Sequence, residues 1–213
     1  IDLVNRKILR LDNINTVVLD EADAMLDMGF INDMRFVIDK MPRIRHTLFF
    51  SATMSPTIKR IVSEFLTDPI TISVKTQDTP DTIEQDIVKL NGRARIDVLT
   101  EMLASPEYKK VLVFGRTKHG VEKLSRILEQ KGIKTGSIHG NKSHNFRQRS
   151  LQKFKQGYTR VLVATDIAAR GLDIDNVSHV INYELPETYN DYVHRIGRTG
   201  RGTQKGMALT LVG

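Results

Sequence analysis

Three carboxylates stand within four residues at Asp20-Glu21-Ala22-Asp23, directly after the apolar run Val17-Val18-Leu19. Like charges crowded in this way repel one another unless a cation or arginines offset them. Asp20 suits a hard oxygen ligand, direct or through water, for a magnesium ion on a nucleotide phosphate, and Glu21 could orient or deprotonate a water. An acidic, solvated turn is the alternative, because carboxylates at strand ends are common outside catalytic sites.

Other polar groups follow two further apolar runs. Leu48-Phe49-Phe50 leads into Ser51-Ala52-Thr53, and residues 161–164 lead into Thr165-Asp166. The working residues of open parallel sheets lie past the carboxyl ends of the strands, so these positions are candidates for a site. Taken alone, Ser51 and Thr53 are typical of helix capping and turn chemistry.

Residues 194–201 hold three arginines and His194 in a stretch that also contains two glycines. Glycine lets the backbone approach a ligand closely, and planar guanidinium groups match phosphate oxygens. The spacing favours phosphate recognition over a solvated basic loop.

A phosphate site would ordinarily bring a Gly-x-x-x-x-Gly-Lys-Ser/Thr loop, and the sequence has none. Gly115 and Gly120 have the spacing, but Val121-Glu122 follows them. This stretch is interpreted as an ordinary turn.

The elements that must position these residues form an alternating pattern. Short β-branched runs alternate with amphipathic stretches along the chain, which predicts α/β lobes with parallel sheets. Strands are expected at residues 16–20, 46–50, 70–74, 86–90, 110–114, 134–138, 160–164, 178–182 and 207–212. Helices are expected at residues 31–40, 56–66, 95–104, 119–130, 145–155 and 188–196.

A polar stretch from Lys75 to Thr82 divides the pattern and is interpreted as a linker. The expected organisation is a first lobe at residues 1–76, a linker at 77–83 and a second lobe at 84–213. Three strands are few for a doubly wound sheet, so the first lobe is expected to be incomplete at its N-terminal side.

Charge and composition narrow the function classes. Lys and Arg number 32 against 25 Asp and Glu, and the net charge of +7 arises in residues 77–213, with 22 basic and 15 acidic residues. This excess favours a polyanion such as nucleic acid as partner. The absence of cysteine excludes disulfides and Cys-type zinc sites. No apolar run reaches the ~18 residues of a membrane helix and no signal peptide is apparent, so a cytoplasmic location is expected.

The motifs in this order resemble motifs II, III, V and VI of the DEAD-box RNA helicases, a family of superfamily 2. The segments that carry the resemblance are Asp20-Glu21-Ala22-Asp23, Ser51-Ala52-Thr53, residues 165–173 and residues 194–201, with flanking matches at residues 25–30, 111–118 and 139–140. Within the family, Thr117-Lys118-His119-Gly120 and residues 139–143 look closest to the bacterial RhlE-type group.

The resemblance implies two RecA-like lobes that hold Mg-ATP between them, with RNA across both. It implies roles in catalysis for Glu21, Asp20 (also the metal ligand), Arg198 and Arg201, and in nucleotide binding for Gly171, Asp173, Arg198 and Arg201. It implies interlobe coupling by Asp23, Ser51, Thr53 and His194, and contacts with a single RNA strand or short duplex by Gly115, Arg116, Thr117, Arg147 and Thr165. RNA would be distinguished from DNA by contacts with its 2′-hydroxyl groups.

Two departures from the family pattern matter. The Gln-motif, the phosphate loop and the early RNA-binding motifs are absent, so the chain is expected to be a core segment that is inactive alone. His144 also stands where the family usually has the glutamine of Gln-x-x-Arg, whereas Arg147 is retained. The alternatives left open are a non-catalytic module that binds RNA or a protein partner and, ranked lower, a DNA-directed helicase.

The tyrosines of the second lobe are interpreted as packing residues rather than as a base-stacking platform. They are Tyr158, Tyr183, Tyr189 and Tyr192.

Overall fold

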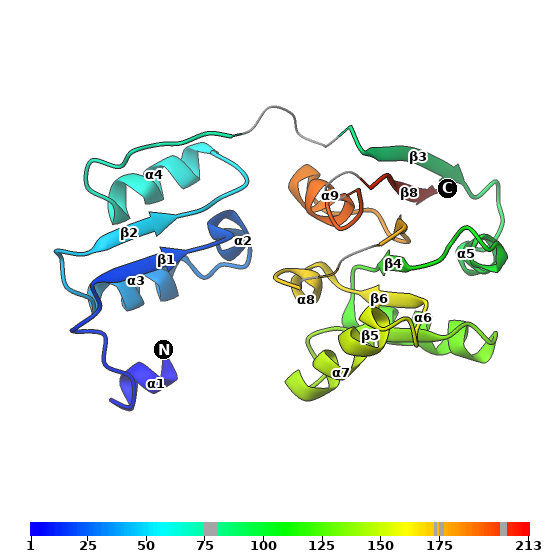
Figure 1. The fold of residues 1–213 in the computed structure, drawn as a ribbon, viewed down its shortest axis with the longest axis horizontal. Coiled ribbons are helices and arrows are strands. Elements are labelled where there is room, and N and C mark those ends of the chain that lie inside the picture. Colours follow the sequence, from blue (N-terminus) through cyan, green and yellow to red (C-terminus); the bar gives the residue numbers. More distant parts are fainter. Residues whose placement is uncertain (75–80, 173, 175–176, 201–203) are drawn as a thin grey trace. The chain divides into compact units, whose positions relative to one another are not determined.

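The computed structural model describes residues 1–74, 81–172, 174, 177–200 and 204–213. The chain divides into two compact units, residues 1–74 and residues 75–213 (Figure 1). Within the described residues, no helix is both long enough and apolar enough to cross a membrane.

The first unit contains two parallel strands, in which Val18 pairs with Leu48. Its elements are α1 (Asp2–Asn5), β1 (Thr16–Leu19), α2 (Ala22–Asp27), α3 (Ile31–Asp39), β2 (His46–Phe49) and α4 (Pro56–Phe65). The start of α4 follows from its sequence, because the Ser55 Oγ accepts a hydrogen bond of 3.3 Å from the Ile58 N–H and Pro56 occupies the first helical position. Helices α3 and α4 bury apolar stripes in one core with Leu19 and Phe49 of the strands.

The strand predicted at residues 70–74 is wrong. Ile70, Ile72 and Val74 are 92%, 82% and 88% exposed, and this segment pairs with no strand in the described part of the unit. Alternating apolar residues are a local signal, whereas a strand also needs a partner to satisfy its backbone groups.

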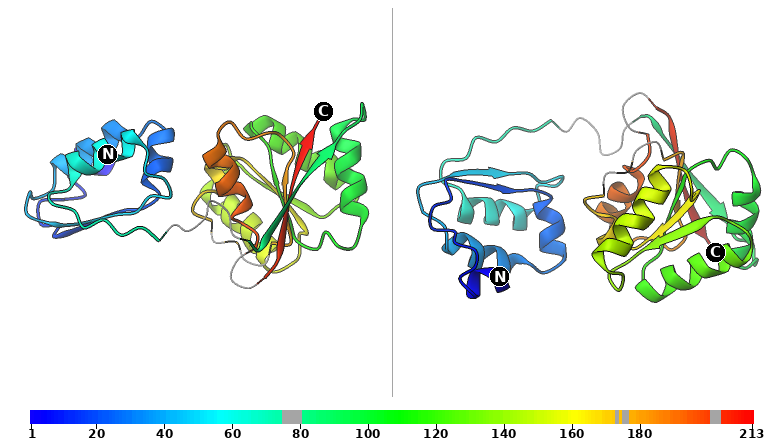
Figure 2. Two further views of the ribbon diagram at one scale, coloured as in Figure 1. Left: turned by 90° about the horizontal axis from the view of Figure 1, so that it is seen from above. Right: turned by 60° about the horizontal axis from the view of Figure 1, so that its bottom comes forward.

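The second unit is built on a six-stranded parallel sheet with the order β3-β8-β7-β4-β6-β5. Figure 2 shows this sheet between its helices. The strands are β3 (Ile83–Lys89), β4 (Val111–Phe114), β5 (Thr135–Ile138), β6 (Val161–Ala164), β7 (His179–Asn182) and β8 (Gly206–Val212). The helices are α5 (Arg95–Ala104), α6 (Lys118–Gln130), α7 (His144–Lys155), α8 (Asp166–Ala169) and α9 (Tyr189–Ile196).

Two hydrophobic cores lie on opposite faces of this sheet. Helices α5 and α6 pack with Val111 and Val113 on one face, and α7 and α8 pack with Leu112 and Phe114 on the other. Strands β4 and β6 are buried along their whole length, as expected for central strands of a parallel sheet covered on both faces. Strands β3 and β5 form its two edges.

The parallel α/β architecture is confirmed, and apart from residues 70–74 each predicted strand and helix is present. Most ends agree to within one residue, and β3 begins earlier than predicted. The short helices α1, α2 and α8 were not predicted, because one or two turns give too few residues to show a helical period.

Candidate functional site

The acidic segment forms a tight turn at the carboxyl end of β1. Glu21 has a left-handed backbone (φ 48°, ψ 45°), and its N–H donates a hydrogen bond of 2.8 Å to the Asp20 Oδ1. The Ala22 N–H donates to the Phe50 carbonyl at 3.1 Å, and the Phe50 N–H donates to the Leu19 carbonyl at 2.7 Å. The turn is thereby fixed to the end of β2, with Asp20 and Glu21 exposed to solvent.

Asp23 points inward and joins the acidic segment to the hydroxyl segment. The Asp23 Oδ2 accepts hydrogen bonds of 3.1 Å from both the N–H and the Oγ1–H of Thr53, and its Oδ1 accepts from the Ala24 N–H at 3.0 Å. The Ser51 hydroxyl donates to the Thr53 carbonyl at 2.7 Å. Three of the residues predicted for interlobe coupling therefore form one network within the first unit, whereas His194 belongs to the second unit.

The carboxylates of the first unit do not form a closed metal cage. No group of three or more His, Cys, Asp or Glu side chains suited to a metal ion occurs among the described residues. The Asp20 Oδ2 accepts no hydrogen bond within the described part of the chain, and Asp20 is an exposed residue. This arrangement fits magnesium, which usually keeps several waters and takes one or two carboxylates together with substrate phosphates.

Arg195 of the arginine-rich stretch is almost fully buried, at 1% exposure. Its Nε and Nη2 donate to the two carboxylate oxygens of Asp166 at 2.6 and 2.8 Å. Its Nη1 donates to the Asn182 Oδ1 at 3.1 Å and to the Glu184 carbonyl at 2.7 Å, and the guanidinium lies 5.1 Å from the centre of the Phe114 ring. Arg195 therefore ties α9 to the carboxyl ends of three strands.

The prediction that the whole arginine-rich stretch recognises phosphate is wrong for Arg195, because all three nitrogens of its guanidinium are bonded inside the protein. Reasoning from sequence also missed the pair formed by Arg170 and Asp191, at 2.7 Å. For the internal role of Arg195, the available signal was the position of its partners Asp166 and Asn182. Both are polar residues at the ends of buried strands, where a polar side chain needs a hydrogen-bond partner.

Arg198 lies next to the glycine loop that follows α8. Its Nη1 donates to the Leu172 carbonyl at 2.9 Å, which brings it beside Gly171, whose φ is +67°. The two segments predicted to bind nucleotide thus adjoin. The other predicted members, Asp173 and Arg201, lie outside the described residues.

Gly200 shows why a glycine stands within the arginine-rich stretch. Its φ is +65°, and a Cβ at this position would lie 2.5 Å from the Ile83 Cγ1. The Thr82 hydroxyl donates to the Gly200 carbonyl at 2.5 Å. The glycine is required by close packing against the start of β3, rather than by the approach of a ligand.

The residues Gly115, Arg116 and Thr117 follow β4 and open α6. The Thr117 Oγ1 accepts a hydrogen bond of 3.0 Å from the Gly120 N–H and caps the helix. The Arg116 N–H donates to the Glu184 Oε2 at 2.6 Å, and its guanidinium pairs with Glu187 at 3.0 Å on the surface. A Cβ at Gly115 would lie 3.1 Å from Val121, so a larger residue would force its neighbour to move.

Thr165 and Arg147 complete the positions predicted to contact RNA. Thr165 follows β6 and is nearly buried, and its carbonyl accepts the N–H groups of Ala168 and Ala169 at 3.1 and 3.0 Å. Arg147 lies in α7, and its Nε is buried without a hydrogen-bond partner among the described residues. Because β4, β6 and β5 are adjacent and parallel, residues that follow them gather at one edge of the sheet.

Glu122 of α6 holds the segment that leads into α7, and sequence reasoning did not single it out. Its Oε2 lies 2.9 Å from the Lys142 Nζ, 3.0 Å from the Ser137 Oγ and 3.1 Å from the His139 Nε2. Burial raises the pKa of Glu122, but the hydrogen bonds from Lys142, His139 and Ser137 outweigh it and lower the pKa to about 2. Glu122 is therefore a fixed negative charge at neutral pH.

Comparison with known proteins relates both units to helicases. The family described as "DEAD/DEAH box helicase" matches residues 1–61, and the family described as "Helicase conserved C-terminal domain" matches residues 94–203. The chain is 47% identical over its whole length to the ATP-dependent RNA helicase CshA of Listeria monocytogenes, and 46% identical to the DEAD-box ATP-dependent RNA helicase CshA of Bacillus subtilis. It covers 41% and 43% of those two proteins, so it spans about two fifths of their length.

Solved structures give the same relationship. The chain is similar to S. cerevisiae Dbp5 bound to RNA and ADP BeF3, with a TM-score of 0.84 and 32% identity over 99% of this chain and 56% of that one. It is also similar to a DEAD box protein from the hyperthermophile Methanococcus jannaschii, with a TM-score of 0.59 and 38% identity over 99% and 57% of the two chains. The parallel units are RecA-like, and the chain belongs to the DEAD-box RNA helicase family.

Proposed function

We propose that this chain is the core part of an ATP-dependent RNA helicase that hydrolyses Mg-ATP and remodels short RNA duplexes. The observation that carries the proposal is the contact between Asp23 and Thr53, which joins the acidic turn after β1 to the hydroxyl segment after β2. The resemblance assigns magnesium and water activation to the first of these segments and coupling of the lobes to the second. The names of the relatives and the RNA and ADP BeF3 bound to Dbp5 support the same partners here.

The residue roles that we propose follow the motifs. Catalysis is assigned to Asp20, Glu21, Arg198 and Arg201, and contact with nucleotide to Gly171, Asp173, Arg198 and Arg201. Coupling of the lobes is assigned to Asp23, Ser51, Thr53 and His194. RNA contact is assigned to Gly115, Arg116, Thr117, Arg147 and Thr165.

A magnesium ion bound with ATP would be held by Asp20, an exposed residue whose Oδ1 already accepts the Glu21 N–H. The ion would neutralise charge on the phosphates. Glu21, which adjoins Asp20 on the same turn, would orient the attacking water and accept its proton at a carboxylate oxygen.

The organisation that we propose assigns residues 1–76 to the ATP-binding lobe, 77–83 to a linker and 84–213 to the C-terminal helicase lobe. Residues 77–80 of this linker lie outside the described residues. We place the protein in the cytoplasm, and retain the RhlE-type group as its subgroup on the strength of residues 117–120 and 139–143.

ATP hydrolysis by the longer protein that contains this chain tests the proposal. The wild type should release phosphate faster when RNA is added, and Glu21→Gln should lower turnover at least about 100-fold, as loss of a general base does. Glu101→Gln, which changes an exposed glutamate paired with Arg93, serves as the matched control. RNA-independent phosphate release, or normal turnover in Glu21→Gln, would contradict the proposal.

A further inference from the structure

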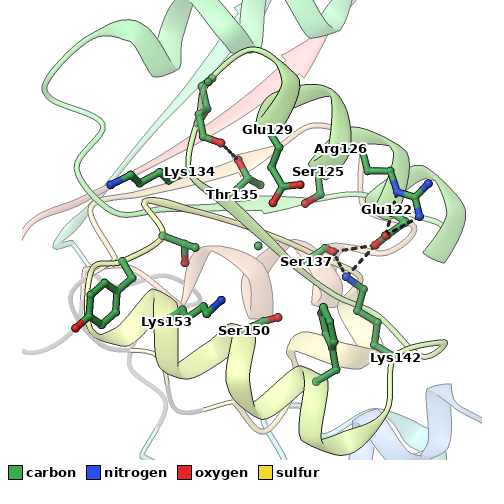
Figure 3. Close-up of a pocket in the computed structure, with 16 residues that line it drawn as sticks. Glu122, Ser125, Arg126, Glu129, Lys134, Thr135, Ser137, Lys142, Ser150 and Lys153 are labelled. Carbon is green, nitrogen blue, oxygen red and sulfur yellow. Dashed lines mark hydrogen bonds and ion pairs between the residues drawn. The ribbon is translucent and has the colours of Figure 1, made fainter.

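A groove runs along the free edge of the sheet in the second unit. Strand β5 is the last strand of the sheet and pairs with β6 alone among the described strands. Helices α6 and α7 pack on opposite faces and leave a cavity of about 670 Å³ beside this strand (Figure 3). We call it the β5-edge groove, lined by Ser125 of α6, by Lys134, Thr135 and Ser137 at β5, and by Ser150 and Lys153 of α7.

Short polar side chains create the groove. Ser125 and Ser150 are buried positions of the two helices where apolar residues would ordinarily fill the space. The hydroxyl that is both buried and unpartnered in the described part of the chain is the nearby Thr159 Oγ1, whereas those of Ser125 and Ser150 open to the groove. Buried polar groups are ordinarily hydrogen-bonded, so the unpartnered Thr159 hydroxyl beside two serines indicates a polar occupant.

The backbone of β5 offers further bonding groups. The Lys134 carbonyl accepts from the Val161 N–H at 3.2 Å, and the Ile138 carbonyl accepts from the Thr165 N–H at 3.3 Å, so the even-numbered positions face β6. Because successive residues of a strand alternate in direction, the N–H and C=O groups of Thr135 and Ser137 face the free edge. The two residues lie at the floor of the groove and are only 4% and 3% exposed, so an added strand would have to enter the groove between α6 and α7. Such an edge is a template for an added strand.

The charges around the groove favour an acidic occupant. Lys134, Lys142, Lys153 and Arg126 line it together with Glu122 and Glu129. Arg126 and Lys142 are both paired with Glu122. Lys134 and Lys153 have no acidic partner among the described residues, so their charges are available to a ligand.

Two aromatic side chains add apolar surface at the groove. Phe146 and Tyr158 both line it and are 50% and 68% exposed, so Tyr158 is not the packing residue that its sequence context predicted. Aromatic side chains of this kind can pack against alternate side chains of an extended peptide, whose remaining side chains would meet the lysines.

We propose that the β5-edge groove binds an extended acidic segment of a partner protein, which adds to the sheet as a further strand beside β5. The segment would bond the outward backbone groups of Thr135 and Ser137 and place carboxylates near Lys134 and Lys153. None of the positions assigned to RNA contact lines this groove, although Arg147 stands next to Phe146 on α7. The inference therefore does not depend on the proposed helicase function.

Selection from a phage-displayed library of random 12-residue peptides on the 213-residue chain tests the inference. The enriched peptides should be rich in Asp and Glu and lack proline at their centres, because a paired strand needs its N–H groups. A synthetic peptide of the enriched sequence should slow amide hydrogen exchange at residues 134–138. Failure to enrich any peptide, or protection confined to another surface, would overturn the proposal.

Variants of the groove sharpen the test. Ser150→Leu fills the groove and should lower the affinity for the peptide at least about tenfold, measured by fluorescence anisotropy. The double change Lys134→Glu with Lys153→Glu should lower this affinity by at least as much. Lys123→Glu, at an exposed position of α6 away from the groove, should change affinity less than about twofold. If Ser150→Leu fails to fold, the double lysine variant decides.

Two other occupants would appear as distinct results. A 12-nucleotide poly(U) RNA that protects residues 134–138 and displaces the peptide would make the groove an RNA surface and overturn the proposal. Self-association of the chain that Ser150→Leu abolishes would assign the edge to a second copy, and would overturn it as well. Peptide binding that poly(U) leaves unchanged supports it.

Discussion

The guanidinium of Arg195 and the carboxylate of Asp166 meet at two points, with Nε to Oδ1 at 2.6 Å and Nη2 to Oδ2 at 2.8 Å. The arginine is buried, whereas the Asp166 side chain is 25% exposed. This asymmetry means that the two partners differ in what their loss leaves behind. Removal of the Asp166 carboxylate leaves the buried charge of Arg195 without its ion-pair partner. Removal of Arg195 leaves a carboxylate that water can reach.

Asp166→Ala should therefore destabilise the second unit by about 3–5 kcal/mol, the cost of an uncompensated buried charge. Arg195→Met, which removes the charge and keeps much of the volume, should cost less. Urea unfolding followed by circular dichroism measures both. Asp97→Ala, which removes the surface partner of Lys131, is the control and should cost under about 1 kcal/mol. Equal losses for Asp166→Ala and the control would show that the pair is not structural.

The contact between Asp23 and Thr53 gives a second prediction. Asp23→Ala leaves the N–H and hydroxyl of Thr53 without their acceptor and should destabilise the first unit by about 1–3 kcal/mol. Thr53→Val removes only the hydroxyl and should cost about 1 kcal/mol. Thermal unfolding of the two variants measures the difference. A larger loss in Thr53→Val than in Asp23→Ala would contradict the network.

Glu122 should make the stability of the second unit depend on acid pH. Its folded pKa of about 2 lies below the ordinary value of 4.5, so its contribution is full above about pH 4.5 and is lost as the pH falls toward 2. Glu122→Gln should be less stable than wild type by about 1–3 kcal/mol at pH 6, and the difference should vanish near pH 2. Glu129→Gln, an exposed change on the same helix, is the control. A difference between wild type and Glu122→Gln that persists at pH 2 would exclude a charge effect.

Arg198 should affect hydrolysis without affecting the fold if it stabilises charge on the transferred phosphate. In the longer protein, Arg198→Ala should lower RNA-stimulated turnover by roughly 10³–10⁵, the range for an arginine finger. Arg93→Ala, on the surface, should leave turnover unchanged. Phosphate release and unfolding midpoints measured together separate the two effects. An unfolding midpoint lowered in proportion to activity would reassign Arg198 to structure.

Arg147 should bind the RNA backbone and carry no sequence preference. Arg147→Ala should lower the affinity for single-stranded RNAs of unrelated sequence by equal factors. It should also reduce the slope of log affinity against log salt by less than about one unit. Arg149→Ala, at an exposed position of the same helix, is the matched control. Salt titrations by fluorescence anisotropy give both slopes. A loss confined to one RNA sequence would indicate base recognition instead.

The sequence predicts most of this fold because the apolar runs are long enough to show their period, and because parallel strands must place their carboxyl ends together. Asp20, Ser51 and Thr165 could be assigned to strand ends for that reason. The direction of a guanidinium could not be predicted, since Arg195 and Arg198 stand in the same glycine-rich stretch and only the former meets Asp166.

Contacts between elements that are far apart in the sequence could not be predicted either. Glu122 meets Ser137, His139 and Lys142, which belong to a later strand and loop. Packing of Tyr192 in a core is confirmed, whereas Tyr189, the first residue of the same helix, is exposed and its ring stacks on that of Tyr192 at 6.3 Å. Such differences depend on tertiary packing, which the local pattern does not contain.

The hydrogen bond between Thr82 and Gly200 also has a mechanical consequence. Thr82 is the residue just before β3, and both its hydroxyl and its carbonyl are engaged, the latter by the Gly206 N–H at 3.0 Å. A tension applied to the chain ahead of Thr82 would load these two bonds before it sheared β3 from β8. Gly200 lies two residues beyond Arg198. A force on the chain where it enters the second unit would therefore reach the loop that holds Arg198 through the hydrogen bond between Thr82 and Gly200.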